Sequence, residues 1–135
     1  MDKKQLIDTL KAQHKNLQED LNIATLNEAS DVVQALNKFK SDLVNHLQLE
    51  NGTFYVDLLK IMSGKGQNTE NTEKFILEMK DIEKVVLGFL DKYNSPESLT
   101  GNKETFSVEL QGIIKALNLR IESEEEGVYE TYLIL

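Results

Sequence analysis

Two short segments place histidine, arginine and glutamate where the apolar stripe of a helix would otherwise continue. In HLQLENGTFY, His46 and Glu50 are four residues apart, and in RIESEEEGVY, Arg120 and Glu124 have the same spacing. Residues four apart lie on one face of a helix, so each pair would point into the interior of the fold. An ionised carboxylate is costly to bury unless it is paired or bound to a cation. We therefore expect a positive charge near the two glutamates.

A further polar residue, His14, lies close to the direction of Leu10 on the apolar stripe of the first predicted helix, when residues advance by about 100°. The chain has no cysteine, so a metal ion would need nitrogen and oxygen ligands. Two imidazoles and two carboxylates form a ligand set that suits iron, manganese or zinc. The candidate metal ligands are His14, His46, Glu50 and Glu124.

Arg120 offers a second source of positive charge. Its guanidinium group could bridge Glu50 and Glu124 by bidentate hydrogen bonds, in which case the histidines would be ordinary buried polar residues and no metal would be needed. It could also extend to water and leave Glu124 to the metal. The residue pattern leaves these alternatives open.

The spacing of apolar residues predicts the helices that would position these side chains. The first helix is expected over about residues 3–27. Ser30 with Asp31 would cap a second helix that ends at SGKGQN, where glycines permit a positive φ. The third helix should end before Pro96, and the last should begin near Leu99 and run almost to the C-terminus.

Four amphipathic helices with short connections predict an all-α, up-down-up-down four-helix bundle that forms one domain over residues 1–135. In antiparallel neighbours, residues equally far from the connecting turn face each other. The midpoint between His14 and His46 falls in the NEAS turn. The midpoints between Met79 and the two glutamate-containing pairs fall in SGKGQN and in the stretch after Ser95. All these side chains should therefore lie at one level of the bundle interior.

The net charge is −8, from 23 acidic and 15 basic residues. This charge would repel phosphate backbones and anionic lipid surfaces, so we expect neither nucleic acid nor a membrane as a partner. The chain shows no signal peptide and no membrane span, and we expect a cytoplasmic protein. The acidic run in IESEEEG is predicted to be a solvent-exposed helix face that could contact a protein partner.

Together, these residues resemble the hemerythrin-like family, or HHE cation-binding family, over nearly the whole chain. The family's pattern has a histidine in the first helix, matched by His14, and a histidine followed four residues later by glutamate in the second, matched by His46 and Glu50. An aromatic residue after each acidic pair is matched by Tyr55 and Tyr129. The resemblance implies a four-helix bundle with a non-heme iron centre.

The chain departs from the family pattern in its second half. The third-helix histidine would fall at Met79 and the fourth-helix histidine at Arg120, while its carboxylate is matched by Glu124. In such centres one iron takes nitrogen ligands from the first two helices and the other from the last two. We therefore expect one ion rather than two, with the Arg120 guanidinium near the second position. Reversible dioxygen binding, which requires two irons, is not expected.

Two functions remain as hypotheses. The first is a hemerythrin-like metal-binding bundle that holds one iron, with manganese or zinc as alternatives, in a sensing or binding role. The second is a metal-free member of the same fold that acts as a protein-interaction or regulatory module, with Arg120 replacing the metal charge. In neither case do we expect an enzyme, and no catalytic residues are predicted.

Overall fold

The computed structural model describes residues 1–26 and 29–135, and these residues form helices and turns without a strand. The helices pack as four long rods. The first rod is α1 (Lys3–Leu26) and the third is α4 (Glu70–Lys92). The second rod consists of α2 (Ala29–Leu49), the π-helical segment η1 (Glu50–Phe54) and α3 (Tyr55–Gly64). The fourth consists of α6 (Lys103–Ser123), the π-helical segment η2 (Glu124–Val128) and α7 (Tyr129–Ile134).

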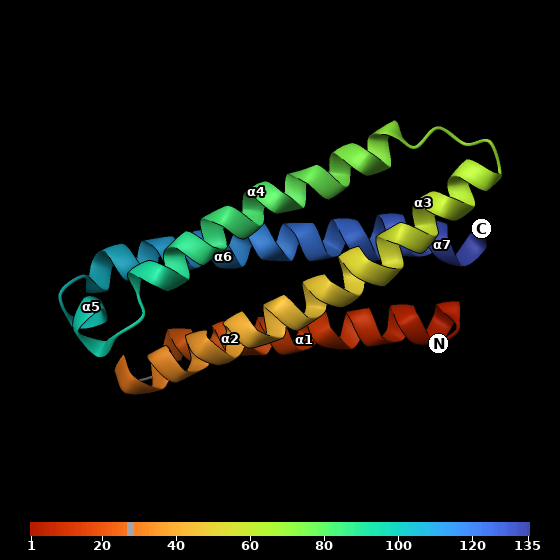
Figure 1. Cartoon of the computed structure of the whole chain (residues 1–135). Coiled ribbons are helices and arrows are strands. Elements are labelled where there is room, and N and C mark those ends of the chain that lie inside the picture. Colours follow the sequence, from red (N-terminus) through yellow and green to blue (C-terminus); the bar gives the residue numbers. More distant parts are fainter. Residues whose placement is uncertain (27–28) are drawn as a thin grey trace.

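The rods run alternately up and down the bundle. Both termini lie at one end, and the short helix α5 (Pro96–Thr100) lies at the other (Figure 1). The predicted all-α bundle of four long helical segments is therefore confirmed. Two of the four rods contain a π-helical turn, which the sequence analysis did not predict.

The first turn differs slightly from the prediction. α2 already begins at Ala29, so Ser30 lies inside the helix and the prediction that it caps α2 was wrong. Asp31 lies in the first turn of α2, where a carboxylate interacts favourably with the positive end of the helix dipole. The predicted end of the first helix at residue 27, and the first half of the NEAS turn, lie outside the described residues.

The connection between the third and fourth rods also needs a correction. Leu99 was predicted to belong to the last long helix, but it lies in α5. Ser95 caps this helix by accepting a hydrogen bond from the Ser98 backbone, and Pro96 occupies its first position. Gly101 follows the helix, and Leu99 is buried in the core. Strong start signals followed at once by glycine therefore produce a separate five-residue helix.

The turn between the second and third rods is as predicted. α3 ends at Gly64 and α4 begins at Glu70. Gly66, within this connection, has a φ of 71°, a conformation that glycine adopts at little cost.

The core consists of two apolar clusters. One is built around residues such as Leu17, Phe39 and Leu117, and the other around Leu10 and Phe54. On the first, second and fourth rods the two clusters are separated by buried polar residues, which are His14, His46, Glu50, Arg120 and Glu124. The turn positions therefore correctly predicted that these five residues form one polar layer, whereas Met79, expected at the same level, belongs to the first apolar cluster.

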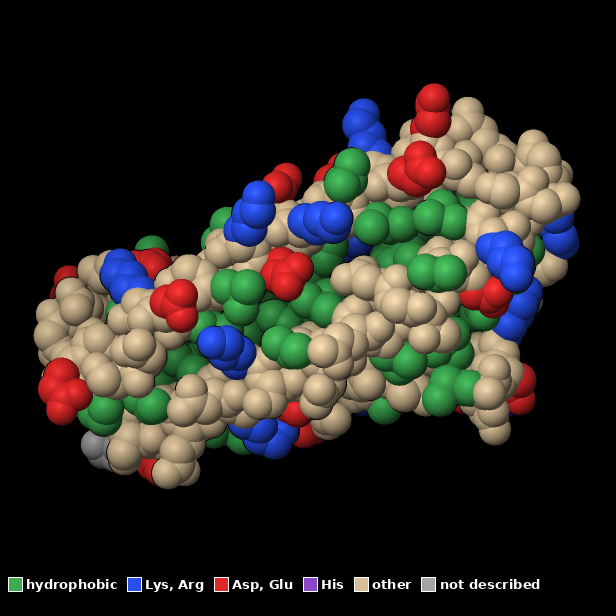
Figure 2. Space-filling view, viewed as in Figure 1, with side chains coloured by type: hydrophobic (Ala, Val, Ile, Leu, Met, Phe, Trp, Pro, Cys, Tyr) green, Lys and Arg blue, Asp and Glu red, His purple; other side chains and the backbone are tan. Residues whose placement is uncertain are grey.

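The surface carries interspersed charges of both signs, and apolar side chains are visible along the seam between α4 and the second rod (Figure 2). Neither His14 nor His46 is visible on this face, in keeping with their burial. None of the described helices is long and apolar enough to cross a membrane.

Candidate metal centre

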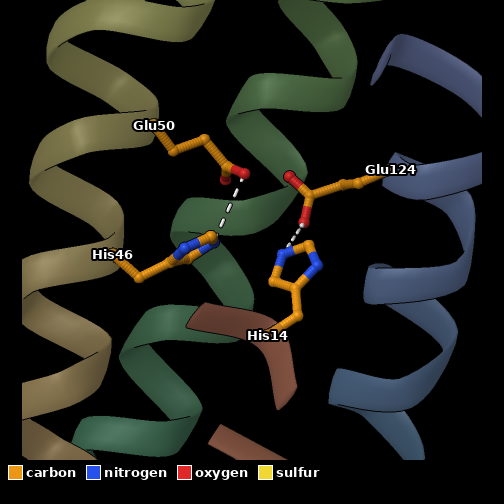
Figure 3. Close-up of side chains that lie close together, drawn as sticks. All are labelled: His14, His46, Glu50 and Glu124. Atoms are coloured by element: carbon orange, nitrogen blue, oxygen red, sulfur yellow. Dashed lines mark ion pairs between the residues drawn. The ribbon is translucent and has the colours of Figure 1, made fainter. Parts of the chain in front are cut away.

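The four predicted ligands come together in the polar layer. His14 comes from α1 and His46 from α2, while Glu50 and Glu124 are the first residues of η1 and η2 (Figure 3). Each offers one ligand atom, and these atoms all lie within 4.8 Å of one another. All four residues are at most 3% exposed. This group of nitrogen and oxygen donors could hold a metal ion.

Each imidazole faces one of the carboxylates through its Nε2 atom. His46 Nε2 lies 3.3 Å from Glu50 Oε2, and His14 Nε2 lies 3.5 Å from Glu124 Oε1. The carboxylates of Glu50 and Glu124 point toward each other across the interior of the bundle (Figure 3). The rings of His14 and His46 are tilted neighbours, with centroids 4.6 Å apart.

The opposite nitrogen of each ring is bound by a residue that the sequence analysis missed. His14 Nδ1 lies 2.7 Å from Glu125 Oε2, and His46 Nδ1 lies 2.8 Å from Gln13 Oε1. A carboxylate or amide oxygen can only accept, so each Nδ1 carries the proton. In the neutral ring this leaves the Nε2 lone pair directed at the centre, as metal ligation requires. The only sequence signal for Gln13 and Glu125 is that each adjoins a predicted ligand.

Two buried tyrosines bind the carboxylates in a crossed arrangement. The Tyr55 hydroxyl donates to Glu124 Oε2 at 2.9 Å, and the Tyr129 hydroxyl donates to Glu50 Oε2 at 2.7 Å. Each tyrosine therefore serves the glutamate of the other rod. The sequence analysis identified the two aromatics but not this role.

The π-helical turns bring each glutamate and the tyrosine after it to the same inward face of the rod. In both, the tyrosine backbone N–H bonds to the carbonyl of the glutamate five residues earlier, so that Tyr55 bonds to Glu50 and Tyr129 to Glu124. A regular α-helix would turn residues five apart to different faces, whereas a π turn closes over this spacing. Glutamate and tyrosine are both buried as a result.

The two histidines have opposite electrostatic surroundings. Burial lowers the pKa of His14, but hydrogen bonds to Glu124 and Glu125 outweigh burial and raise the pKa above its usual value. Burial lowers the pKa of His46 to about 4, and the neighbouring His14 adds to this effect. Without a metal ion, His14 is therefore the imidazole that favours a proton and His46 is neutral.

The pKa values of Glu124 and of the two tyrosines are also shifted. Burial raises the pKa of Glu124, and repulsion by Glu50 adds to it, while the hydrogen bond to His14 acts in the opposite direction. Burial and the nearby carboxylates raise the pKa values of Tyr55 and Tyr129. Both tyrosines therefore remain protonated donors to the carboxylates at neutral pH.

Arg120 lies inside the bundle and is 5% exposed, so it does not extend to water. Nor does it bridge the carboxylates by hydrogen bonds. Its Nη1 atom donates to the Phe75 carbonyl of α4 at 2.8 Å, and Nη2 donates to the Tyr55 hydroxyl at 3.3 Å. The guanidinium carbon lies 3.5 Å from the centroid of the Phe75 ring, a cation–π contact.

The link between Arg120 and the centre is electrostatic. Its Nε atom lies 3.9 Å from Glu124 Oε2 and has no hydrogen-bond partner among the described residues. Arg120 therefore places a permanent positive charge beside one carboxylate of the centre. Met79, where the resemblance implies a histidine, is buried in an apolar cluster as a simple core residue.

The donor set suits one ion better than two. Four nitrogen and oxygen atoms converge, and both imidazoles are held with Nε2 facing the interior. A second ion would need nitrogen ligands from the third and fourth rods, where Met79 and Arg120 stand. A guanidinium group stays protonated and has no lone pair to donate. The four residues present could therefore hold one metal ion.

Four packed helical rods with a buried group of histidines and carboxylates define the class of helical-bundle proteins whose interior can hold a metal ion. The family model described as "Hemerythrin HHE cation binding domain" matches residues 5–132, and the chain belongs to this family. Comparisons with curated proteins and with solved structures gave no match.

Proposed function

We propose that the protein is a hemerythrin-like bundle that binds one divalent ion, with iron as the first candidate and manganese or zinc as alternatives. His14, His46, Glu50 and Glu124 would hold this ion, and Arg120 would supply the charge of the missing second ion. A bound iron would supply a redox-active centre, and the chain would protect it from water and fix its ligands. The role we propose is sensing or binding.

The position of Arg120 carries this proposal. A buried guanidinium 3.9 Å from Glu124 partly neutralises the carboxylates and repels a second cation. At the same time it leaves both Nε2 atoms facing Glu50 and Glu124, because its Nη1 and Nη2 donors are engaged by Phe75 and Tyr55. The first half of a two-ion centre is therefore complete and the second half is replaced by a fixed charge.

Binding rather than turnover is supported by the packing around the ligands. A cavity of about 450 Å³ lies near α5, and one of about 560 Å³ lies between α4 and α6. None of the four candidate ligands lines either cavity. The four candidate ligands are buried and lie apart from these two cavities, an arrangement that suits an ion-binding function.

The test is the metal content per chain, measured by inductively coupled plasma mass spectrometry on untagged protein produced with iron, manganese and zinc supplied. We expect about one ion per chain, since four ligands complete one site. About two ions per chain would contradict the role assigned to Arg120. No ion in folded protein would contradict metal binding altogether.

The ligand assignment is tested by the double variant His14→Ala, His46→Ala, which should lose the bound metal because only the carboxylates remain. The matched control is Lys15→Ala, Asn45→Ala, which changes exposed residues next to the two histidines. Equal metal content in both double variants would show that the histidines are not ligands.

A second candidate function is favoured by the charge balance of the metal-free centre. Two carboxylates, the Arg120 guanidinium and a protonated His14 would together be close to neutral, so the fold does not depend on a metal ion to bury these groups. In that case the protein would be a metal-free interaction or regulatory module that binds partners through its acidic surface. Folded protein without metal in the same measurement would favour this function.

A further inference from the structure

The two imidazoles at the centre are supported unequally. His14 Nδ1 faces a carboxylate oxygen of Glu125 at 2.7 Å, whereas His46 Nδ1 faces an amide oxygen of Gln13 at 2.8 Å. A hydrogen bond to a carboxylate is stronger than one to a neutral amide. It also raises the basicity of the opposite ring nitrogen, which strengthens that nitrogen as a metal ligand.

Consecutive residues of η2 contact both nitrogens of the same ring. Glu124 faces His14 Nε2 at 3.5 Å, and Glu125 binds His14 Nδ1 at 2.7 Å. On α1, in the same way, Gln13 binds His46 while its neighbour His14 enters the centre. α1 is therefore joined to the second rod by an amide and to the fourth rod by a carboxylate.

The acidic run in IESEEEG is divided by this contact. Glu122 and Glu126 are exposed, whereas Glu124 is buried and the Glu125 side chain is 32% exposed. The expected solvent-exposed face is therefore found at Glu122 and Glu126, whereas Glu125 is only partly exposed and Glu124 is buried, as expected of a candidate ligand. Glu125 combines partial shielding from water with direct contact to a fully buried imidazole.

We propose that Glu125 is a positioning residue that makes His14 the stronger of the two nitrogen ligands, an inference that rests on the proposed metal-binding function. Its carboxylate holds the His14 ring by Nδ1 and increases electron donation from Nε2. Gln13 orients His46 in the same way without the charge. The metal centre is therefore anchored mainly through the contact between α1 and η2.

The experiment compares zinc affinity in Glu125→Gln, Glu125→Ala and Glu126→Gln, measured by competition with a chelator. Glu126→Gln is the matched control, because it removes the same charge from the next, exposed residue. Loss of such a supporting partner commonly lowers metal affinity by about 10- to 100-fold. We expect Glu125→Ala to fall in this range, Glu125→Gln to lose less, and Glu126→Gln to remain near the parent protein. Gln13→Glu should increase the affinity.

A second readout reports the position of the ring directly. In the zinc-loaded protein, ¹⁵N NMR should show a protected His14 Nδ1–H that is lost in Glu125→Ala and kept in Glu126→Gln. Gln13→Ala should affect the His46 Nδ1–H instead. Circular dichroism and thermal unfolding confirm that each variant is folded, which separates loss of positioning from loss of structure.

The outcomes distinguish this inference from the proposed function. If the parent protein binds zinc and Glu125→Gln, Glu125→Ala and Glu126→Gln all bind it equally well, the positioning role of Glu125 is overturned while metal binding stands. If folded parent protein binds no zinc, iron or manganese, the proposed function fails and the inference fails with it.

Discussion

The second and fourth rods carry segments, residues 46–55 and 120–129, that share a glutamate and a tyrosine at matching positions but begin with different residues. Both contain a buried glutamate at the start of a π turn and a buried tyrosine just after it. In both, the tyrosine hydroxyl crosses to the glutamate of the other segment. The first segment begins with His46 and the second with Arg120.

The first residue of each segment decides whether the segment offers an imidazole nitrogen or a fixed positive charge. His46 is short, and its Nε2 atom stays 3.3 Å from Glu50. Arg120 is longer, and its terminal nitrogens pass the centre to reach the Phe75 carbonyl and the Tyr55 hydroxyl. The same backbone frame therefore positions a candidate metal ligand on one rod and a fixed cation on the other. Four experiments can break or sharpen this comparison.

The largest effect is expected from restoring the second half of the pattern. In the double variant Met79→His, Arg120→His, the fixed charge is removed and two imidazoles are added from the third and fourth rods. We expect metal content to rise from about one to about two ions per chain, since each ion then has two imidazoles and shares the carboxylates. Elemental analysis measures this directly. The control Met79→Leu should stay at about one.

If the double variant is folded but still holds one ion, Arg120 and Met79 are not the residues that restrict the centre to one ion. The expectation that fails would then be that Met79 lies at the same level of the bundle as the candidate ligands. Met79 packs in an apolar cluster, while the α4 contact to Arg120 comes from Phe75, one turn earlier.

The second prediction concerns the charge of Arg120 in metal-free protein. Arg120→Met should destabilise the chelator-treated protein by roughly 3 kcal/mol, because it removes one of the two positive groups beside the buried Glu124 carboxylate. With metal bound, the cost should be smaller, since the ion itself neutralises Glu124. Urea unfolding with and without zinc measures both values. Equal costs in the two states would show that Arg120 does not substitute for a cation.

Part of this comparison could be predicted from the sequence. Turn positions depend on local residue types such as those in SGKGQN, and they fix which residues of neighbouring helices lie at one level. A regular helical wheel places Glu50 on the apolar stripe of its helix. The four candidate ligands were therefore identified correctly as neighbours.

The π turns could not be predicted in this way. On a regular wheel, residues five apart, such as Glu50 and Tyr55, differ in direction by about 140°. They share an inward face only because a backbone hydrogen bond closes over five residues, and no residue type specifies that bond. The direction taken by Arg120 was likewise undetermined, because a long side chain can reach several acceptors and the Phe75 carbonyl is visible only in the fold.

The third prediction tests the crossed tyrosines. Tyr55→Phe and Tyr129→Phe each remove a hydrogen bond to a buried carboxylate, which typically contributes about 1.5–3 kcal/mol. We expect Tyr55→Phe to cost more, because its second contact is with the charged Arg120 Nη2, whereas the second contact of Tyr129 is with His14 Nε2. Urea unfolding of the metal-free proteins gives the comparison. A larger loss of stability in Tyr129→Phe would contradict this expectation and would show that the hydrogen bond to Glu50 is the stronger link between the rods.

The smallest effect is expected from pH, and it distinguishes the two histidines. A metal ion must displace any proton on Nε2, so affinity falls with decreasing pH where the metal-free imidazole is protonated. Hydrogen bonds to Glu124 and Glu125 outweigh burial and raise the pKa of His14, whereas burial lowers that of His46 to about 4. Between about pH 5 and the raised pKa of His14, metal binding should therefore release a proton from His14 and none from His46.

Isothermal titration calorimetry with zinc, in buffers of different ionisation enthalpy, measures this proton release. Below the raised pKa of His14, affinity should fall by about tenfold for each unit of decreasing pH, which corresponds to one bound proton. Above that pKa the dependence should level off. In Glu125→Gln the levelling should begin at lower pH, since one of the hydrogen bonds that raise the pKa of His14 has lost its charge. Release of two protons per ion near neutral pH would contradict the prediction that the two imidazoles have unequal surroundings. It would indicate that the two histidines behave alike.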